Sequence, residues 1–230
     1  AGGNRPSLIS AGLNGLSTVQ FDGSNDYLRA TNLNISQPYT IYTVVKTTGS
    51  SGRGYVFDGV TDNNQRSLLA LHYNQKISIW AAKWGNTNFE KPIGFNTISA
   101  IFNGTNSQVS LNGNVISNLD PGNRDLSNGI TIAGNYNANA DFLKGDIAEF
   151  LIFNQAALDA DRMEVEGYLA QKWGLDNLLP NENQYSSRFS SESASGSGNS
   201  LDLSNGVLAE VLTGGTEDVF DGGSGFSTSM

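Results

Sequence analysis

Two tryptophans stand close together in the segment "KISIWAAKW", at Trp80 and Trp84. Strand side chains point alternately to opposite faces, and the apolar Ile77 and Ile79 therefore predict a core face. If the strand continues to its end, the opposite face carries Lys76, Ser78, Trp80, Ala82 and Trp84. A tryptophan aligned with Lys and Ser is less easily explained by core packing.

An indole ring can stack on the apolar side of a pyranose, while amides, carboxylates and cations bond the sugar hydroxyls. Nearby segments supply further candidates for the same ligand site: Tyr73, Arg53, Asp58 and Arg66. The alternative is that Trp80 covers a second hydrophobic layer or lies in an interface between subunits. Both interpretations require Trp80 to lie away from the main core.

A second candidate site is the turn "FDGSNDYL", which carries Asp22, Asn25 and Asp26 directly after a predicted strand. Calcium takes six to eight oxygen ligands from carboxylates, amides and carbonyls. Asp146 would complete such a shell if its strand pairs with the strand that ends at Asp22. Alternatively, the two aspartates of the turn accept hydrogen bonds from its backbone N–H groups. If calcium binds here, its role is structural.

Short alternating runs such as "STVQF", "YTIYTVVKT" and "GDIAEFLIFN" must position these residues. Asn-Gly pairs recur between them, and "SLNGNVIS" predicts a hairpin with its turn at Asn112-Gly113. Many short strands with closely spaced turns are typical of a sandwich. The pattern predicts an all-β fold, either a sandwich or a jelly roll.

One helix is predicted, over "LDADRMEVEGYLAQKWG". Asp159 is a candidate N-cap, and Gly174 is placed to end the helix. Val165, Leu169 and Trp173 recur at helical spacing and form a stripe that would dock on the sandwich. Trp173 is therefore expected in the core.

The formal net charge of −9 argues against nucleic acid as a partner. No apolar run approaches the length needed to span a membrane. The acidity would also disfavour anionic polysaccharides weakly. Most of it belongs to the C-terminal residues 181–230, which hold seven acidic residues and one basic residue.

The chain divides by composition into a domain at 1–186, a Ser/Gly-rich linker at 187–200 and an acidic tail at 201–230. In the tail, "VLTGGT" and "VFDGGS" repeat an apolar pair followed by Gly-Gly. This extended tail is interpreted as a docking segment for other protein subunits.

The strings "FDGSNDYL" and "KGDIAEFLIFNQAALDADRMEVEGYLAQKWGL" resemble the LamG-like members of the concanavalin A-like lectin/glucanase superfamily. The resemblance covers roughly residues 5–186. It implies a two-sheet antiparallel jelly roll of the kind found in secreted, surface-attached and viral proteins. Such modules often bind carbohydrate and sometimes hold a structural calcium.

Catalysis is not expected. Glucanases of this superfamily carry a Glu-x-Asp-x-x-Glu strand, which is absent here. Glu164 and Glu166 come closest but lie on the predicted helix, where we interpret them as a solvated face. The chain has one histidine, His72, and this excludes a multi-histidine metal site.

Two functions fit these observations. The first is a non-catalytic adhesion module, displayed outside the cell or on a virion, that binds a glycan or cell-surface polysaccharide. The second is a structural or decoration protein of a virion or extracellular assembly, anchored through residues 187–230.

Overall fold

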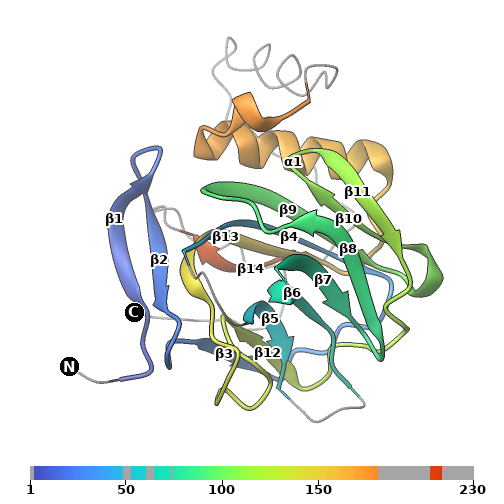
Figure 1. Cartoon of the computed structure of the whole chain (residues 1–230). Helices are drawn as coiled ribbons and strands as arrows, with labels where there is room; N and C mark the ends of the chain where they lie inside the picture. The colour runs from blue at the N-terminus through green and yellow to red at the C-terminus, as the bar shows by residue number, and fades with distance from the viewer. Residues whose placement is uncertain (1–2, 49–52, 61–64, 74, 181–207, 214–230) are drawn as a thin grey trace.

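A computed structural model describes residues 3–48, 53–60, 65–73, 75–180 and 208–213, apart from the side chains of 72–73 and 208–213. These residues form two antiparallel sheets and one α-helix, so the predicted sandwich is confirmed (Figure 1). The predicted linker at 187–200 lies outside the described residues, as does most of the tail.

The larger sheet has eight strands. Seven follow in the order β1 (Ser7–Leu13), β2 (Leu16–Asp22), β13 (Lys144–Phe153), β4 (Tyr39–Thr47), β9 (Phe95–Phe102), β10 (Ser107–Leu111) and β11 (Asn114–Leu119). The eighth, β14 (Leu208–Thr213), also pairs with β13. A short 3-10 helix, η1 (Gly104–Asn106), connects β9 to β10.

The smaller sheet has six strands, in the order β3 (Leu28–Thr31), β12 (Gly129–Ile132), β5 (Gly54–Gly59), β6 (Leu68–Tyr73), β7 (Lys76–Trp80) and β8 (Trp84–Glu90). Every pairing in this sheet is antiparallel.

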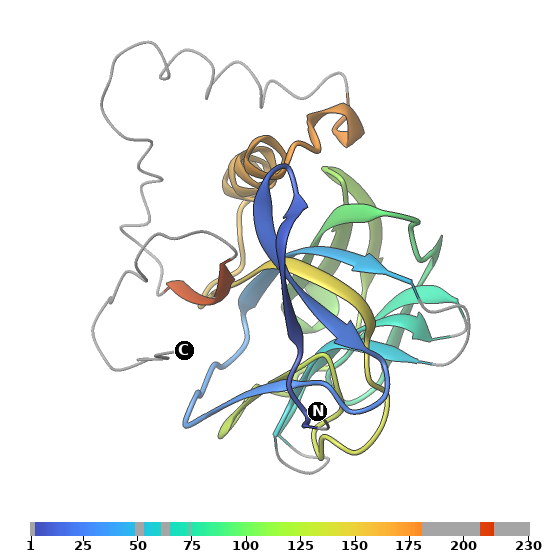
Figure 2. The same ribbon diagram turned by 90° about the vertical axis from the view of Figure 1, so that its left-hand side faces the viewer.

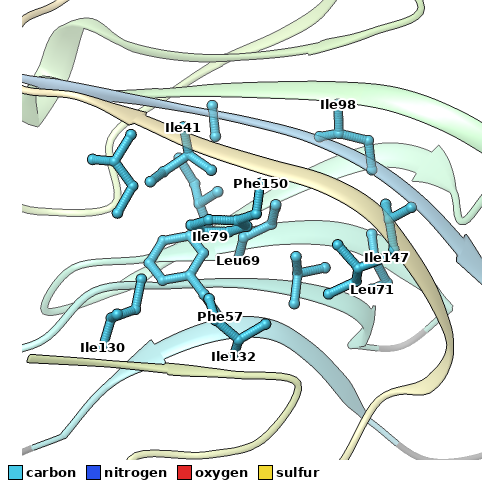
Figure 3. Packing of buried hydrophobic residues seen from close by; sticks show 14 of the residues in the cluster. Ile41, Phe57, Leu69, Leu71, Ile79, Ile98, Ile130, Ile132, Ile147 and Phe150 are labelled. Atoms are coloured by element: carbon cyan, nitrogen blue, oxygen red, sulfur yellow. The ribbon is translucent and has the colours of Figure 1, made fainter. Parts of the chain in front are cut away.

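The main core lies between the two sheets (Figure 3). Ile41, Ile147 and Phe150 come from the larger sheet and meet Phe57 and Ile79 of the smaller one. The rings of Phe57 and Phe150 pack edge to face with centroids 5.7 Å apart. The alternation read from the sequence is confirmed here, since Ile77 and Ile79 are fully buried.

The helix α1 (Asp159–Trp173) covers the outer face of the larger sheet (Figures 1 and 2). Its apolar stripe, Val165, Leu169 and Trp173, packs on Tyr42 and Val44 of β4, and Trp173 is buried as expected. Gly174 ends the helix in the left-handed conformation. The N-cap is Leu158 rather than Asp159, which is the first residue of the helix. A 3-10 turn, η2 (Asp176–Leu178), follows.

Charged groups are buried beneath this helix. The Trp173 Nε1–H donates to Glu149 of β13, and Lys172 pairs with the same carboxylate at 3.1 Å. Glu166 accepts from Ser99 Oγ at 2.6 Å and pairs with Arg162 at 2.6 Å. The interpretation of Glu166 as part of a solvated face is wrong, because its position faces the sheet and it is 1% exposed.

Two of the Asn-Gly pairs form two-residue hairpin turns. Asn112 and Gly113 both have positive φ and join β10 to β11, and Asn14 with Gly15 joins β1 to β2. Primed turns of this kind match the twist of the paired strands. None of the helices in the described ranges is long and apolar enough to cross a membrane.

The described part of the tail, β14, extends the larger sheet. β2 pairs with the first half of β13, through Ile147, whereas β14 pairs with Glu149–Phe153 on the second half. The first apolar pair of the tail repeat, Val211-Leu212, falls in this strand.

We expect Arg162→Met to lower the free energy of unfolding by about 3–5 kcal/mol, because it leaves the buried Glu166 carboxylate without its cation. Urea unfolding at pH 7 measures the change. Glu164→Gln, a neighbour on the same helix, is the control and should change stability by less than about 0.5 kcal/mol. Equal stability of the two variants would contradict the burial described here.

Deleting residues 201–230 removes β14, and the backbone of Glu149–Phe153 then keeps its pairing with β4 but loses its partner on the other side. We expect faster amide exchange in this segment, together with a tendency to associate through the open edge. Hydrogen exchange and light scattering measure the two effects. Deleting only residues 218–230 should leave both unchanged; identical behaviour of the two truncations would argue against β14.

Candidate functional site

The outer face of the smaller sheet lies on the side of the sandwich away from α1 (Figure 1). Strand register brings one side chain from each strand into a row across this face. Thr131 pairs with both Arg29 and Asp58, and Leu68 pairs with Trp80, which in turn pairs with Trp84. Since Phe57 faces Leu69, the next position brings Asp58 to Leu68. The row therefore reads Arg29, Thr131, Asp58, Leu68, Trp80 and Trp84, and we call it the cross-sheet row.

The two tryptophans share this face for a reason that differs from the prediction. The strand does not continue from Trp80 to Trp84, because β7 ends at Trp80 and β8 begins at Trp84. A turn of three residues, Ala81–Lys83, reverses the chain and places the two indoles opposite each other as a cross-strand pair. Directly opposite side chains lie about 5 Å apart at Cβ.

Both tryptophans are half-buried and pack on a small hydrophobic layer formed by Tyr55, Leu68 and Ala70. Trp80 thus covers a second hydrophobic layer, as the alternative interpretation stated. The layer and a ligand role are compatible, since each indole also keeps an exposed part. Ser78 and Asn86 lie beside them, and the Ser78 hydroxyl donates to the Asn86 side chain at 2.9 Å.

A buried ion pair occupies the middle of the row. Asp58 is fully buried and pairs with Arg66. The Asp58 carboxylate also accepts from the backbone N–H of Gly59 at 2.8 Å and of Tyr136 at 3.0 Å. Three donors to one carboxylate offset part of the cost of its removal from water.

Arg66 lies between two aromatic rings. Its guanidinium carbon is 4.4 Å from the Tyr136 ring centre and 4.8 Å from that of Trp80. Arg124 lies over Trp80 as well, at 4.9 Å. Guanidinium groups stack on aromatic rings through cation–π attraction. The Trp80 ring therefore makes cation–π contacts with two arginine side chains.

Arg124, Tyr136 and Arg29 belong to this cluster and were missed by the sequence analysis. Arg29 reaches it from β3, where it donates to Thr131 Oγ1 and to the backbone oxygen of Tyr136. Arg124 and Tyr136 stand in connecting segments that carry no strand pattern. Their places depend on long-range packing, which local sequence signals do not report.

Two glycines set the positions of the arginines. A Cβ on Gly59 would lie 2.5 Å from Cβ of Arg66, so only glycine allows the approach of Arg66 to β5. Gly122 has φ +93, and a Cβ there would lie 2.3 Å from the backbone oxygen of Ala81. The Pro121 oxygen accepts from the N–H groups of Ala81 and Lys83, which fixes Arg124 beside the β7–β8 turn.

Burial raises the pKa of Asp58 to about 7, although Arg66 and two backbone N–H groups act in the opposite direction. Tyr55 beneath the tryptophans has its pKa raised to about 12, first by burial and then by Asp141 and Asp58. Arg53 is exposed and interacts with Tyr55 and with Asp141, whose own pKa is raised by burial.

The predicted ligand residues thus come together in large part. Trp80, Trp84 and Asp58 lie on the cross-sheet row, and Arg66 lies beside it. Arg53 precedes β5, at the end of that strand away from Asp58, and interacts with Tyr55. Tyr73 is the last residue of β6, and its side chain lies outside the described residues.

The Asp22 turn is held by its own backbone. Asp22 Oδ1 accepts from the N–H groups of Ser24, Asn25 and Asp26, and Asp26 Oδ2 accepts from the N–H of Asp22. Burial acts to raise the pKa of Asp22, but the backbone hydrogen bonds together hold it below its usual value. Burial and the Asp22 charge raise the pKa of Asp26. These contacts are the ones expected if the two aspartates accept hydrogen bonds from the backbone of the turn.

Asp146 lies on the strand that pairs with β2, as the calcium interpretation required, but opposite Gln20 rather than Asp22. It is buried, pairs with Lys46 at 2.7 Å and accepts from the Gln20 side chain. Within the part of the chain that the structure describes, no group of three or more His, Cys, Asp or Glu could hold a metal ion. Calcium binding stays a prediction.

Solved structures share this fold at low sequence identity. Domain 4 of AbnA, an extracellular arabinanase of Geobacillus stearothermophilus in complex with arabinotriose, has a TM-score of 0.57 at 15% identity, over 78% of this chain and 82% of that one. A pentraxin of Limulus polyphemus has a TM-score of 0.51 at 15% identity, over 72% and 84%. The binding domain of botulinum neurotoxin serotype D has a TM-score of 0.52 at 12% identity, over 72% and 46%.

These likenesses agree with a concanavalin A-like sandwich and show the fold alone. No protein-family model matches the chain, and no curated protein does. Membership of the LamG-like family stays a prediction.

The pKa of Asp58 leads to an expected pH dependence. A carboxyl whose pKa is higher in the folded state than in the unfolded one contributes stability below its unfolded pKa, and this stability is lost as pH rises through the folded value. We expect the Asp58 contribution to fall between about pH 4 and about pH 7. Urea unfolding across this range measures it against Asp58→Asn, in which this part of the profile should be flat. Parallel profiles would show that Asp58 stays ionised.

Proposed function

We propose that the chain is a non-catalytic carbohydrate-binding module, which binds saccharides on the outer face of the smaller sheet around Trp80 and Trp84. The observation that carries the proposal is the cross-strand pair of half-buried indoles set among arginine side chains. Aromatic surface meets the apolar side of a sugar, and guanidinium N–H groups donate to its oxygens.

The fixed geometry of the face supports this proposal. Asp58 and Tyr136 hold Arg66, and the Pro121–Ala81 contacts hold the segment that carries Arg124. Side chains fixed before binding lose little conformational entropy when the ligand arrives. The antiparallel sheet beneath them adds to this rigidity, because the donors come from strands and from loops bonded to strands.

Solved structures of similar fold support the proposal that the ligand is a saccharide. The arabinanase domain of the same fold was solved in complex with arabinotriose. Together with the LamG-like resemblance of the sequence, this favours a saccharide over other ligands. We also propose, on the resemblance alone, that the module acts outside the cell or on a virion surface.

The assembly alternative stays a prediction of its own. It needs residues 187–230 to dock on another subunit. The described piece of that segment, β14, pairs with β13 of the same chain. This pairing gives the tail one role within the chain itself, and docking on a partner would have to use other residues of the tail.

We expect Trp80→Ala and Trp84→Ala each to weaken saccharide binding about tenfold or more, through lost stacking and lost support for the arginines. A glycan array followed by calorimetric titration of the best ligand measures this. Leu8→Ala, at a residue of β1 that is 57% exposed, is the matched surface control. Undiminished binding by both tryptophan variants, or no glycan bound by the wild type, would contradict the proposed function.

A further inference from the structure

We infer that this site binds an oligosaccharide rather than a single sugar, and that Asn86 is the residue that bonds the second sugar unit. The ligand then follows strand β8, with one unit on the indole of Trp84 and the next beside Asn86. The inference rests on the proposed function and deepens it, because it gives the length of the ligand and the direction in which it lies.

Strand register places Asn86 next to the tryptophan pair. β8 is the last strand of the smaller sheet (Figure 1). Trp84 and Asn86 lie two residues apart on this strand, so their side chains point to the same outer face, about 7 Å apart along the strand. This spacing is close to the length of one sugar unit in an extended saccharide. A ligand with one unit on Trp84 therefore brings its next unit to Asn86 when it runs along the strand.

A buried hydroxyl orients the amide of Asn86. Ser78 pairs with Asn86 across the strands, is fully buried, and donates through Oγ to Asn86 Oδ1 at 2.9 Å. The carbonyl side of the amide is thus engaged with the protein. The Nδ2 group carries two N–H donors, and it donates to no acceptor among the residues that the structure describes.

The Asn86 side chain is exposed as well as oriented. Its Nδ2 group can therefore donate to the oxygens of a ligand while Oδ1 keeps its bond to Ser78. Because the amide is held before binding, little conformational entropy is lost when the ligand arrives.

The direction along β8 is favoured over the direction across the sheet. Beyond Trp80 in the cross-sheet row come Leu68 and Asp58, whose side chains are fully buried and cannot reach a ligand. Along β8, the residue that follows Trp84 on the outer face is Asn86, which is exposed and carries a donor. The tryptophans and the arginines beside them thus contact one sugar unit, and the contact for a second unit lies on β8.

The length of the ligand is tested first, on the full chain. Arabinose, xylose and glucose are titrated by calorimetry beside the arabinan, xylan and cellulose oligosaccharides of two to six units. Where the glycan array selects another glycan, its fragments of the same lengths are titrated instead. We expect at least tenfold tighter binding of the trisaccharide than of the monosaccharide, and little gain beyond it. A monosaccharide that binds as tightly as its trisaccharide would overturn the inference.

Asn86→Asp separates the donor role from a structural one. The carboxylate of this variant still accepts from Ser78 but has no N–H group to donate. We expect about fivefold weaker binding of the trisaccharide and unchanged binding of the monosaccharide. An unchanged melting temperature shows that the variant is folded.

Asn118→Asp is the matched control. Asn118 is also exposed, and its Oδ1 also accepts from a cross-strand neighbour, Gln108, but on the larger sheet. This substitution adds the same charge away from the proposed site and should leave binding unchanged. Equal effects of the two substitutions on trisaccharide binding would overturn the inference, since Asn86 would then make no specific contact.

The two proposals fail in different ways. Trisaccharide binding that needs Trp80 and Trp84 but is undiminished in Asn86→Asp would overturn the inference and leave the proposed function standing. Binding of no glycan by the wild type would overturn the proposed function and the inference with it.

Discussion

Strand side chains alternate between two faces, so a two-sheet sandwich has two outer faces in addition to its core. The chain covers one of them with α1, which buries Trp173 against the larger sheet. On the smaller sheet, Tyr55, Leu68 and Ala70 are covered in part by the side chains of Trp80 and Trp84. The site described here is a consequence of that arrangement, because the residues that shield this layer are also the ones that face solvent.

A cover made of side chains needs to be held in place, and the Asp58–Arg66 pair does this. The carboxylate lies at the middle of the cross-sheet row and binds Arg66 and the backbone of Tyr136. Arg66 then lies between the rings of Tyr136 and Trp80. Removing one partner of a buried pair leaves a charge without compensation. The Tyr136 and Trp80 rings therefore keep their positions only while Asp58 and Arg66 stay paired in the folded sheet.

Local sequence pattern predicted what depends on local structure. The sandwich, the Asn112-Gly113 hairpin, the helix stripe and the outward side of Trp80 all follow from periodicity and turn chemistry. Trp84 lies on the predicted face, but it reaches that face through a hairpin. The alternating spacing of residues 76–84 looked like one continuous strand and gave no sign of the turn. Arg124 and Tyr136 could not be found, because loop residues are placed by contacts with distant strands. Glu166 was misread because the sequence does not show that its carboxylate and the Arg162 guanidinium, one turn earlier in the helix, are both buried against the sheet.

The three indole N–H groups of the chain provide the most direct test of where a saccharide binds. Trp173 is fully buried and donates to Glu149, so it is an internal reference far from the proposed contact face. Titration of the labelled protein with an array-selected glycan, followed by nuclear magnetic resonance, should move the Trp80 and Trp84 signals and leave that of Trp173 in place. A bound glycan that leaves Trp80 and Trp84 unmoved would contradict the account, since the ligand would then occupy another surface.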